Sequence, residues 1–133
     1  MEISAPPEEV FPFLEASDER LRWMGLLVES EPLEEGRFRD VFVDRGHRIE
    51  IDAEVVERDA PRVLVVRLRA SSFDATSMQK LEAVDGGTRL TTVVETTYTK
   101  RLARLAGPFV ARRAQQQLER DLERLKELAE EAR

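Results

Sequence analysis

The sequence contains no cysteine, no asparagine and a single histidine among its 133 residues. Without cysteine the chain has no disulfide, no thiolate metal ligand and no thiol nucleophile. The one histidine, His47, follows Gly46 in a turn signal, and we interpret it as a turn residue. One histidine without a cysteine falls short of the ligands that a zinc site needs, so we expect no metal and no cofactor.

Long hydrophobic runs are absent as well. No segment approaches the roughly 20 apolar residues of a membrane-spanning helix, and the acidic N-terminus has no apolar stretch of signal-peptide length. The lack of cysteine agrees with a reducing compartment. We therefore expect a cytoplasmic protein without a membrane span, built as one domain over residues 1–133.

Positive charge is in short supply. The net charge of −6 argues against a general nucleic-acid binder, because phosphates require a positive surface. Residues 1–35 hold ten acids against Arg20 and Arg22, whereas the basic stretch over residues 100–113 contains no acid. We interpret that stretch as a solvated helix face that complements the acidic region. A docking site for a partner or for an anionic ligand is the alternative.

The segment ISAPPEEVFPFL near the start has the chemistry of a helix N-terminus. Pro7 suits the first helical turn, and the two glutamates after it fall where the helix dipole favours acids. Pro12 lies beyond the first turn and is expected to kink or restart this short helix. Ser17 is predicted to cap a second short helix that ends near Trp23.

Between Leu26 and Thr99 apolar and polar residues alternate, and turn signals recur at regular spacing, which predicts six antiparallel strands joined by hairpins. Opposed residues of such a hairpin share a face of the sheet. The predicted registers, with Gly36 in a left-handed bulge, set Phe42 opposite Ile49, Asp40 opposite Ile51, Phe38 opposite Ala53, Ser30 opposite Asp40, Ile51 opposite Leu68, Ala53 opposite Val66 and Leu81 opposite Thr92. One face is then largely apolar and the other carries paired charges.

The last third of the chain has apolar residues at spacings of three and four. This pattern predicts a long helix over residues 108–131, after a short helix or turn near 100–106. The apolar stripe needs a partner, and the apolar face of the sheet is large enough to supply it. A homodimeric coiled coil is the structural alternative, although the spacing departs from a heptad after Leu118. Both a monomer and a homodimer remain open.

The inward face of the predicted sheet carries several polar side chains among the apolar ones. Buried polar groups need hydrogen-bond partners, and a cavity would supply them as water or ligand. The alternative is that the threonines bond across strands and that Asp40 lies near an exposed end of the sheet. The candidate ligand-binding residues are Trp23, Phe38, Asp40, Phe42, Ile51, Val66, Leu68, Ser77, Gln79, Thr92, Val94, Thr96, Tyr98, Phe109 and Val110.

Asp40 is the one acid that the registers place on the inward face of the strands. Burial among apolar neighbours disfavours a charged carboxylate, which is the condition for general acid or base work near neutral pH. Asp40 is therefore the first candidate catalytic residue, and Tyr98 is the second. Glu95 falls on the outer face, and no nucleophile-elbow sequence is present.

Several short motifs follow one another in a fixed order along the chain. They are I-x-A-P-x-E-x-V-F-x-x-L over residues 3–14, Trp23, D-x-P-R over 59–62, G-G-T-R-L-T over 86–91 and LERLKELAEE over 122–131. In this order and over nearly the whole chain they resemble the START-like (SRPBCC) superfamily, in its polyketide cyclase/dehydrase branch. The resemblance implies an α+β helix-grip fold, in which a curved antiparallel sheet of six to seven strands wraps around a long C-terminal helix. Two short helices follow a short first strand and close one end over a cavity.

Members of this superfamily usually have a fuller first strand, whereas here only residues 1–4 precede the A-P motif. We expect the corresponding edge of the sheet to be open or covered by a dimer partner, with a truncated first strand as the third alternative. For function, the resemblance and the inward face favour binding of a small hydrophobic or amphipathic molecule, such as a lipid, an isoprenoid or a polyaromatic metabolite. One alternative is a cyclase or dehydratase that uses Asp40 or Tyr98. The other is a protein-interaction module like coenzyme-Q-binding or ribosome-associated relatives, acting through the basic stretch.

Overall fold

The computed structural model describes the backbone of residues 1–99 and 107–133, and the side chains of residues 1–99 and 111–133. The helix or turn expected near 100–106 lies outside these residues. The elements are β1 (Glu2–Ile3), α1 (Pro7–Glu15), α2 (Ser17–Trp23), β2 (Leu27–Pro32), β3 (Arg37–Asp44), β4 (His47–Asp59), β5 (Val63–Arg69), β6 (Phe73–Val84), β7 (Gly87–Tyr98) and α4 (Gly107–Glu131).

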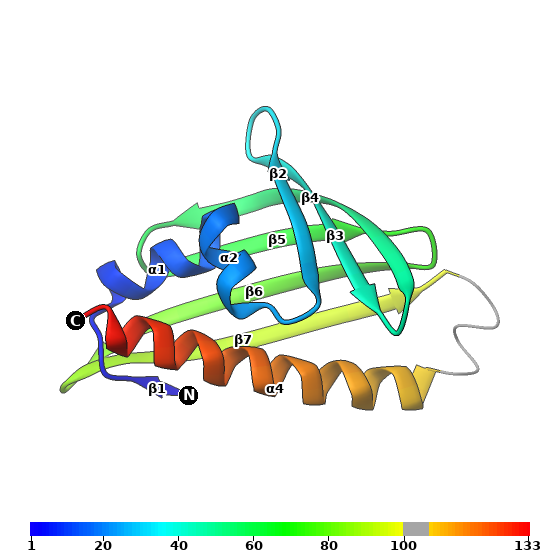
Figure 1. Ribbon diagram of the computed structural model, residues 1–133. Helices are drawn as coiled ribbons and strands as arrows, with labels where there is room; N and C mark the ends of the chain where they lie inside the picture. The colour runs from blue at the N-terminus through cyan, green and yellow to red at the C-terminus, as the bar shows by residue number, and fades with distance from the viewer. Residues whose placement is uncertain (100–106) are drawn as a thin grey trace.

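Seven strands form one antiparallel sheet in the order β1-β7-β6-β5-β4-β3-β2. The sheet is curved, α1 and α2 close one end of it, and α4 runs alongside β7 (Figure 1). This arrangement confirms the helix-grip fold. β1 pairs with Thr88 and Arg89, and within residues 1–99 and 107–133 no further strand pairs with that side of β7 from Thr91 onward. None of the described helices is long and apolar enough to cross a membrane.

The two short helices differ from their predicted details at two places. α1 begins at Pro7 as predicted but continues through Pro12 to Glu15, so the expected restart does not occur. Pro12 and Glu8 are both exposed, and the Glu8 carbonyl that loses its N–H partner can bond to water instead. In α2 the N-cap is Ala16 without a side-chain hydrogen bond, and Ser17 is already helical.

The hairpin registers around β3 confirm the predicted pairing. Phe42 lies opposite Ile49, and Asp40 lies opposite Ile51 on β4 and opposite Ser30 on β2. The pairing with β2 depends on the turn before β3, where Gly36 has φ +75° and therefore a conformation that glycine adopts without strain. Alternation thus fixes both the register and the inward face of this part of the sheet.

Two other registers are offset from the prediction by two residues. Leu68 lies opposite Ala53 instead of Ile51, because a bulge between Val55 and Glu57 adds a residue to β4 and the following turn spans residues 60–62. Leu81 lies opposite Leu90 instead of Thr92, because the turn is made by residues 85–86 and β7 already begins at Gly87. An offset of two keeps every side chain on its predicted face, so the inward set is unchanged.

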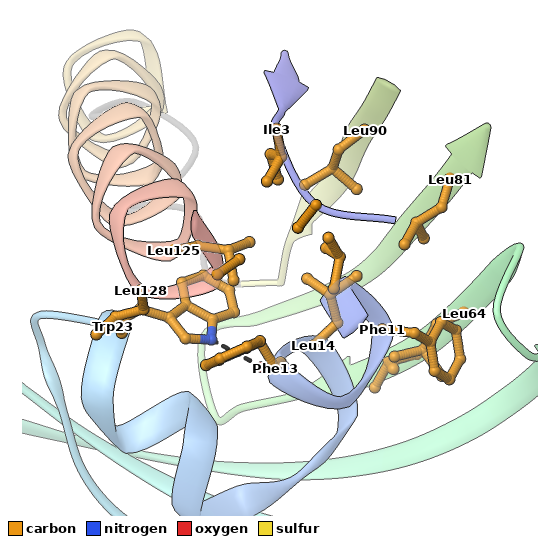
Figure 2. Packing of buried hydrophobic residues seen from close by; sticks show 14 of the residues in the cluster. Ile3, Phe11, Phe13, Leu14, Trp23, Leu64, Leu81, Leu90, Leu125 and Leu128 are labelled. Carbon is orange, nitrogen blue, oxygen red and sulfur yellow. Dashed lines mark hydrogen bonds between the residues drawn. The ribbon is translucent and has the colours of Figure 1, made fainter. Parts of the chain in front are cut away.

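The hydrophobic core lies at the end of the molecule where α1, α2, β1 and the second half of α4 meet. Leu125, Leu128 and Ala129 of α4 are buried there against side chains of the short helices and of the sheet (Figure 2). Burial of one such leucine contributes roughly 1.5–3 kcal/mol. In contrast, residues 111–116 in the first half of α4 are exposed. The predicted helix is confirmed, and among its described side chains those of the second half pack in the core, whereas those of residues 111–116 do not.

Candidate ligand-binding cavity

A cavity of about 890 Å³ lies between the first half of α4 and the far end of the sheet. It is bounded by three parts of the fold: the concave ends of the strands, the loop between α2 and β2, and one side of α4. Its lining consists of Met24, Leu26, Phe42, Asp44, Arg45, Ile49, Val94, Thr96, Tyr98, Ala111, Arg113, Ala114, Gln115, Gln116, Gln117, Leu118, Arg120 and Asp121.

The position of the cavity follows from two features of the fold. β1 ends its pairing at the start of β7, so none of the described strands pairs with the outer edge of β7 from Thr91 to Tyr98. The facing part of α4 presents small or polar side chains, among them Ala111, Ala114 and three consecutive glutamines. Val94 of β7 is consequently 44% exposed although it lies on the concave face. The space is therefore open to solvent on this side.

The lining has an apolar floor and a charged margin. Phe42 and Ile49 of the floor oppose each other across the β3–β4 hairpin, and Met24 and Leu118 approach from the α2–β2 loop and from the helix. A hydrocarbon or aromatic body placed on this floor would lose contact with water, which is the main source of affinity in such sites. The floor therefore suits the apolar part of a small molecule.

Charged side chains gather where α4 faces the β3–β4 turn, and they form the margin. Arg113 of α4 donates a hydrogen bond to Asp44 at 2.8 Å and so connects the helix to the end of β3. Arg45 follows Asp44 in the turn and lines the same cavity. Two turns further along α4, Arg120 donates to the side-chain oxygen of Gln117 at 2.7 Å.

Asp121 marks the place where the cavity ends and the packed part of α4 begins. Burial raises the pKa of its carboxyl above the ordinary value of 3.8, while hydrogen bonds from the Gly25 N–H and from Gln117, together with the charge of Arg120, act in the opposite direction. The Gly25 bond is 3.0 Å long and ties the α2–β2 loop to α4. A Cβ at Gly25 would lie 3.0 Å from the Gln117 amide, so this close approach favours glycine.

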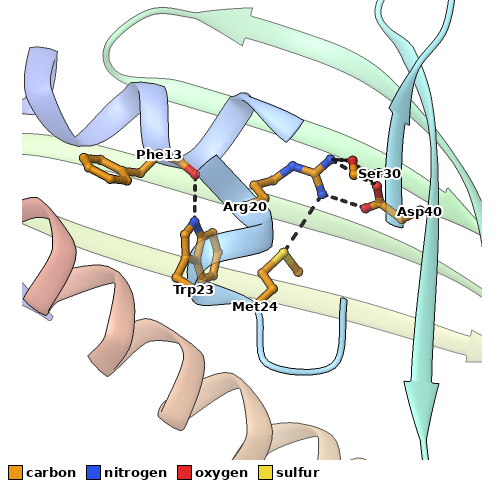
Figure 3. Close-up of polar contacts among 6 residues, drawn as sticks. All are labelled: Phe13, Arg20, Trp23, Met24, Ser30 and Asp40. Atoms are coloured by element: carbon orange, nitrogen blue, oxygen red, sulfur yellow. Dashed lines mark hydrogen bonds and ion pairs between the residues drawn. The ribbon is translucent and has the colours of Figure 1, made fainter. Parts of the chain in front are cut away.

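A second polar centre lies inside the protein, between α2 and the β2–β3 hairpin (Figure 3). Arg20 is only 6% exposed and donates to both oxygens of Asp40, at 2.6 and 3.1 Å. Ser30 accepts from Arg20 at 2.7 Å and donates to Asp40 at 2.6 Å. The Arg20 guanidinium also stacks on the Phe38 ring, 4.5 Å from its centre. Both buried charges are therefore paired, as burial requires.

A smaller pocket of about 230 Å³ adjoins this polar centre. It is lined by α1, α2, the β2–β3 hairpin, β4 and β5, with Arg20, Phe38 and Val66 among its lining residues. The Nε of Arg20 is the one buried side-chain nitrogen or oxygen of the described residues that has no hydrogen-bond partner.

The predicted ligand-binding residues fall into separate groups. Those that line the large cavity are Phe42, Val94, Thr96 and Tyr98, and those that line the small pocket are Phe38 and Val66. Ile51 is buried and Leu68 packs against the core. Ser77, Gln79 and Thr92 are half-buried on the concave face. The side chains of Phe109 and Val110 lie outside the described residues.

Two residues have environments other than those the sequence suggested. Asp40 is held by Arg20 and Ser30 and is not among the residues that line the large cavity. Trp23 belongs to the packed core, where its indole N–H donates to the Phe13 carbonyl at 2.8 Å.

Gln79 on β6 and Thr92 on β7 form a hydrogen bond with each other. The hydroxyl of Thr92 donates to the side-chain oxygen of Gln79 at 2.5 Å, across the two strands. For this pair the structure agrees with the alternative that threonines bond across strands. The Thr92 hydroxyl and the Gln79 oxygen therefore bond to each other without a ligand, and the cavity is defined by its geometry at the end of β7.

Sequence reasoning missed Arg20, Arg45 and Arg120, whereas Arg113 lies in the basic stretch that it offered as an alternative docking site. Arg20 lies three residues before Trp23, so the two side chains share one face of α2, and the buried Asp40 requires a positive partner. Those two signals together could have identified Arg20. The glutamines of α4 interrupt a helix that otherwise alternates charged and apolar residues, and this change in composition marks the cavity side.

The sheet, the long helix and the cavity between them define a helix-grip protein. The chain belongs to the family described as polyketide cyclase / dehydrase and lipid transport, whose model matches residues 1–130. Among curated protein sequences none matches this chain significantly.

Solved structures share the fold at low sequence identity. A conserved protein from Geobacillus kaustophilus has a TM-score of 0.83 at 14% identity, over 99% of this chain and 93% of that one. A protein from Thermus thermophilus has a TM-score of 0.80 at 20% identity, over 99% and 94% of the two chains. Ara h 8.0201 has a TM-score of 0.72 at 17% identity, over 97% and 93%. These likenesses establish the fold alone.

Proposed function

We propose that this protein binds a small hydrophobic or amphipathic molecule, of the kind represented by lipids, isoprenoids and polyaromatic metabolites, in the large cavity. The observation that carries the proposal is the cavity itself, whose volume of about 890 Å³ lies in the range of small-molecule sites. Its apolar floor and charged margin suit a molecule with one apolar and one polar end. The family description, which includes lipid transport, supports the same class of ligand.

The proposal is tested by filling the cavity. Thr96 and Thr97 are neighbours on β7, and their side chains lie on opposite faces of the sheet, Thr96 in the cavity lining and Thr97 outside it. We expect the Thr96→Trp variant to reduce binding of the neutral fluorescent probe N-phenyl-1-naphthylamine by about tenfold or more, since an indole occupies much of the apolar floor. The Thr97→Trp variant is the matched control and should bind the probe like the unmodified protein.

Thermal unfolding of both variants separates loss of binding from loss of folding. If the probe does not bind the unmodified protein, or if Thr96→Trp folds and binds it with unchanged affinity, the cavity is not the ligand site. If both variants lose binding equally, the effect lies in the strand and not in the cavity.

A further inference from the structure

The charges that line the large cavity do not cancel. Three arginines, Arg45, Arg113 and Arg120, face two aspartates, Asp44 and Asp121. The chain as a whole has the opposite balance, with a net charge of −6. An excess of positive charge in one recess of an acidic protein needs an explanation, because like charges brought together without counter-ions repel each other.

Contacts within the protein occupy few of the N–H donors of these arginines. Arg113 makes one ion pair, through a single nitrogen, to Asp44. Arg120 bonds to the neutral amide of Gln117, and Arg45 pairs with no carboxylate among the described residues. A guanidinium has five N–H groups, so most of the donors of these three side chains are available to a bound molecule.

The two aspartates of the lining contribute less negative charge than their number suggests. Asp44 is already neutralised by Arg113. Burial raises the pKa of Asp121, which disfavours its charged form, and its Oδ1 atom accepts bonds from the Gly25 N–H and Gln117. The lining therefore keeps a surplus of one positive charge, beside an apolar floor that excludes water from one side of the charged groups.

The arginines also occupy a defined place relative to the apolar floor. Asp44 and Arg45 are consecutive, and Arg113 contacts Asp44, so Arg45 and Arg113 both lie at the β3–β4 turn. Phe42 and Ile49 of the floor flank the same turn. Arg120 is seven residues after Arg113, about 10 Å further along the helix. A molecule whose body rests on the floor thus has a cationic site beside one end of it.

We propose that the molecule bound in this cavity is an anionic amphiphile whose carboxylate or phosphate group is bound by Arg45 and Arg113 at the β3–β4 turn. This inference rests on the proposed function and names the chemical class of its ligand. Guanidinium groups bind carboxylate and phosphate through paired N–H donors, and such charge-assisted bonds are stronger beside an apolar surface than in water.

The test compares head groups on one hydrocarbon chain. Displacement of N-phenyl-1-naphthylamine is measured with dodecanoate, dodecyl phosphate, 1-dodecanol and dodecyltrimethylammonium, each below its micelle concentration. We expect one or both anions to bind about tenfold more tightly than the alcohol, and the cation to bind most weakly. Comparison of dodecanoate with dodecyl phosphate identifies the preferred head group, and a preference for either anion over the alcohol supports the inference. Added salt should reduce this preference.

Matched variants assign the preference to the cavity. Arg45→Gln removes one positive charge from the lining, whereas Arg48→Gln removes one from the opposite face of the sheet, where Arg48 contacts Glu29 and Glu50. Arg45→Gln should lower the affinity for the preferred anion several-fold and leave that for 1-dodecanol unchanged. Arg48→Gln should change neither, which controls for net charge.

The outcomes distinguish this inference from the proposed function. Binding of the alcohol and the cation as tightly as both anions, or an equal effect of Arg45→Gln and Arg48→Gln, would overturn the anionic class while leaving the cavity as a ligand site. Failure of the probe and of all four amphiphiles to bind would overturn the proposed function itself.

Discussion

The two halves of α4 show how one helix can serve both stability and binding. In the second half Leu125 is completely buried and lies in the core with the short helices and β1, which we call the packed end. In the first half residues 111–116 are exposed and the helix lines the large cavity, which we call the hollow end. The same secondary structure therefore contributes packing energy at one end and a binding surface at the other. Each end can be tested separately.

The strongest test of this comparison concerns two aspartates of β3 that each pair with an arginine. At the packed end, Asp40→Ala would leave Arg20 buried without its counter-ion, and we expect a loss of about 3–5 kcal/mol in the free energy of unfolding. At the hollow end, Asp44→Ala removes a partly exposed pair with Arg113 and should cost no more than about 1 kcal/mol. Urea unfolding measures both. Equal losses would contradict the contrast.

The second test uses two leucines of α4. Leu125→Ala creates a cavity in the core and should destabilise the protein by about 2–5 kcal/mol. Leu118 is half-buried at the edge of the large cavity, and its replacement by Ala should cost below about 1.5 kcal/mol. The leucines are seven residues apart on one helix, so helix propensity cancels in the comparison of their unfolding curves. A large loss for Leu118→Ala would mean that the hollow end is packed in solution.

Much of this fold could be predicted because each hairpin depends on local information. Alternation assigns each strand residue to a face, and the turn residues set the register, so that the β3–β4 pairing agrees residue by residue. The offset at Leu68 and Leu81 has a local cause that alternation does not reveal. A bulge, or a turn that begins one residue earlier, changes the partner by two positions and leaves the face unchanged.

The candidate site was harder to predict, because it depends on contacts between distant parts of the chain. Asp40 was correctly placed inward, but its partner Arg20 comes from a helix 20 residues earlier, and only the packing of that helix brings its long side chain to the sheet. The position of the large cavity depends on where α4 leaves the sheet. No single segment carries that information.

The third test enlarges two alanines of α4. Ala129 is 1% exposed at the packed end, so Ala129→Leu forces extra atoms into a filled space and should cost about 1–3 kcal/mol. Ala114 lines the large cavity, and Ala114→Leu has room for its side chain there, with a change within about 0.5 kcal/mol. Thermal unfolding compares the two. An equal cost at both positions would show that the hollow end has no free space.

The last and smallest effect concerns Asp121, which lies at the boundary between the two ends. Because burial raises the pKa of its carboxyl in the folded protein above the ordinary value of 3.8, the folded state binds the proton more tightly than the unfolded state does. The stabilising contribution of the protonated form is therefore present at low pH and is lost as the pH rises from 3.8 through the folded pKa.

Asp121→Asn removes this dependence and keeps an oxygen that can accept the Gly25 N–H. Its free energy of unfolding, measured relative to the unmodified protein, should increase over that interval and then stay constant. A difference that is independent of pH, or that falls as the pH rises, would mean that water reaches this carboxyl and that the hollow end extends further along α4 than the lining residues indicate.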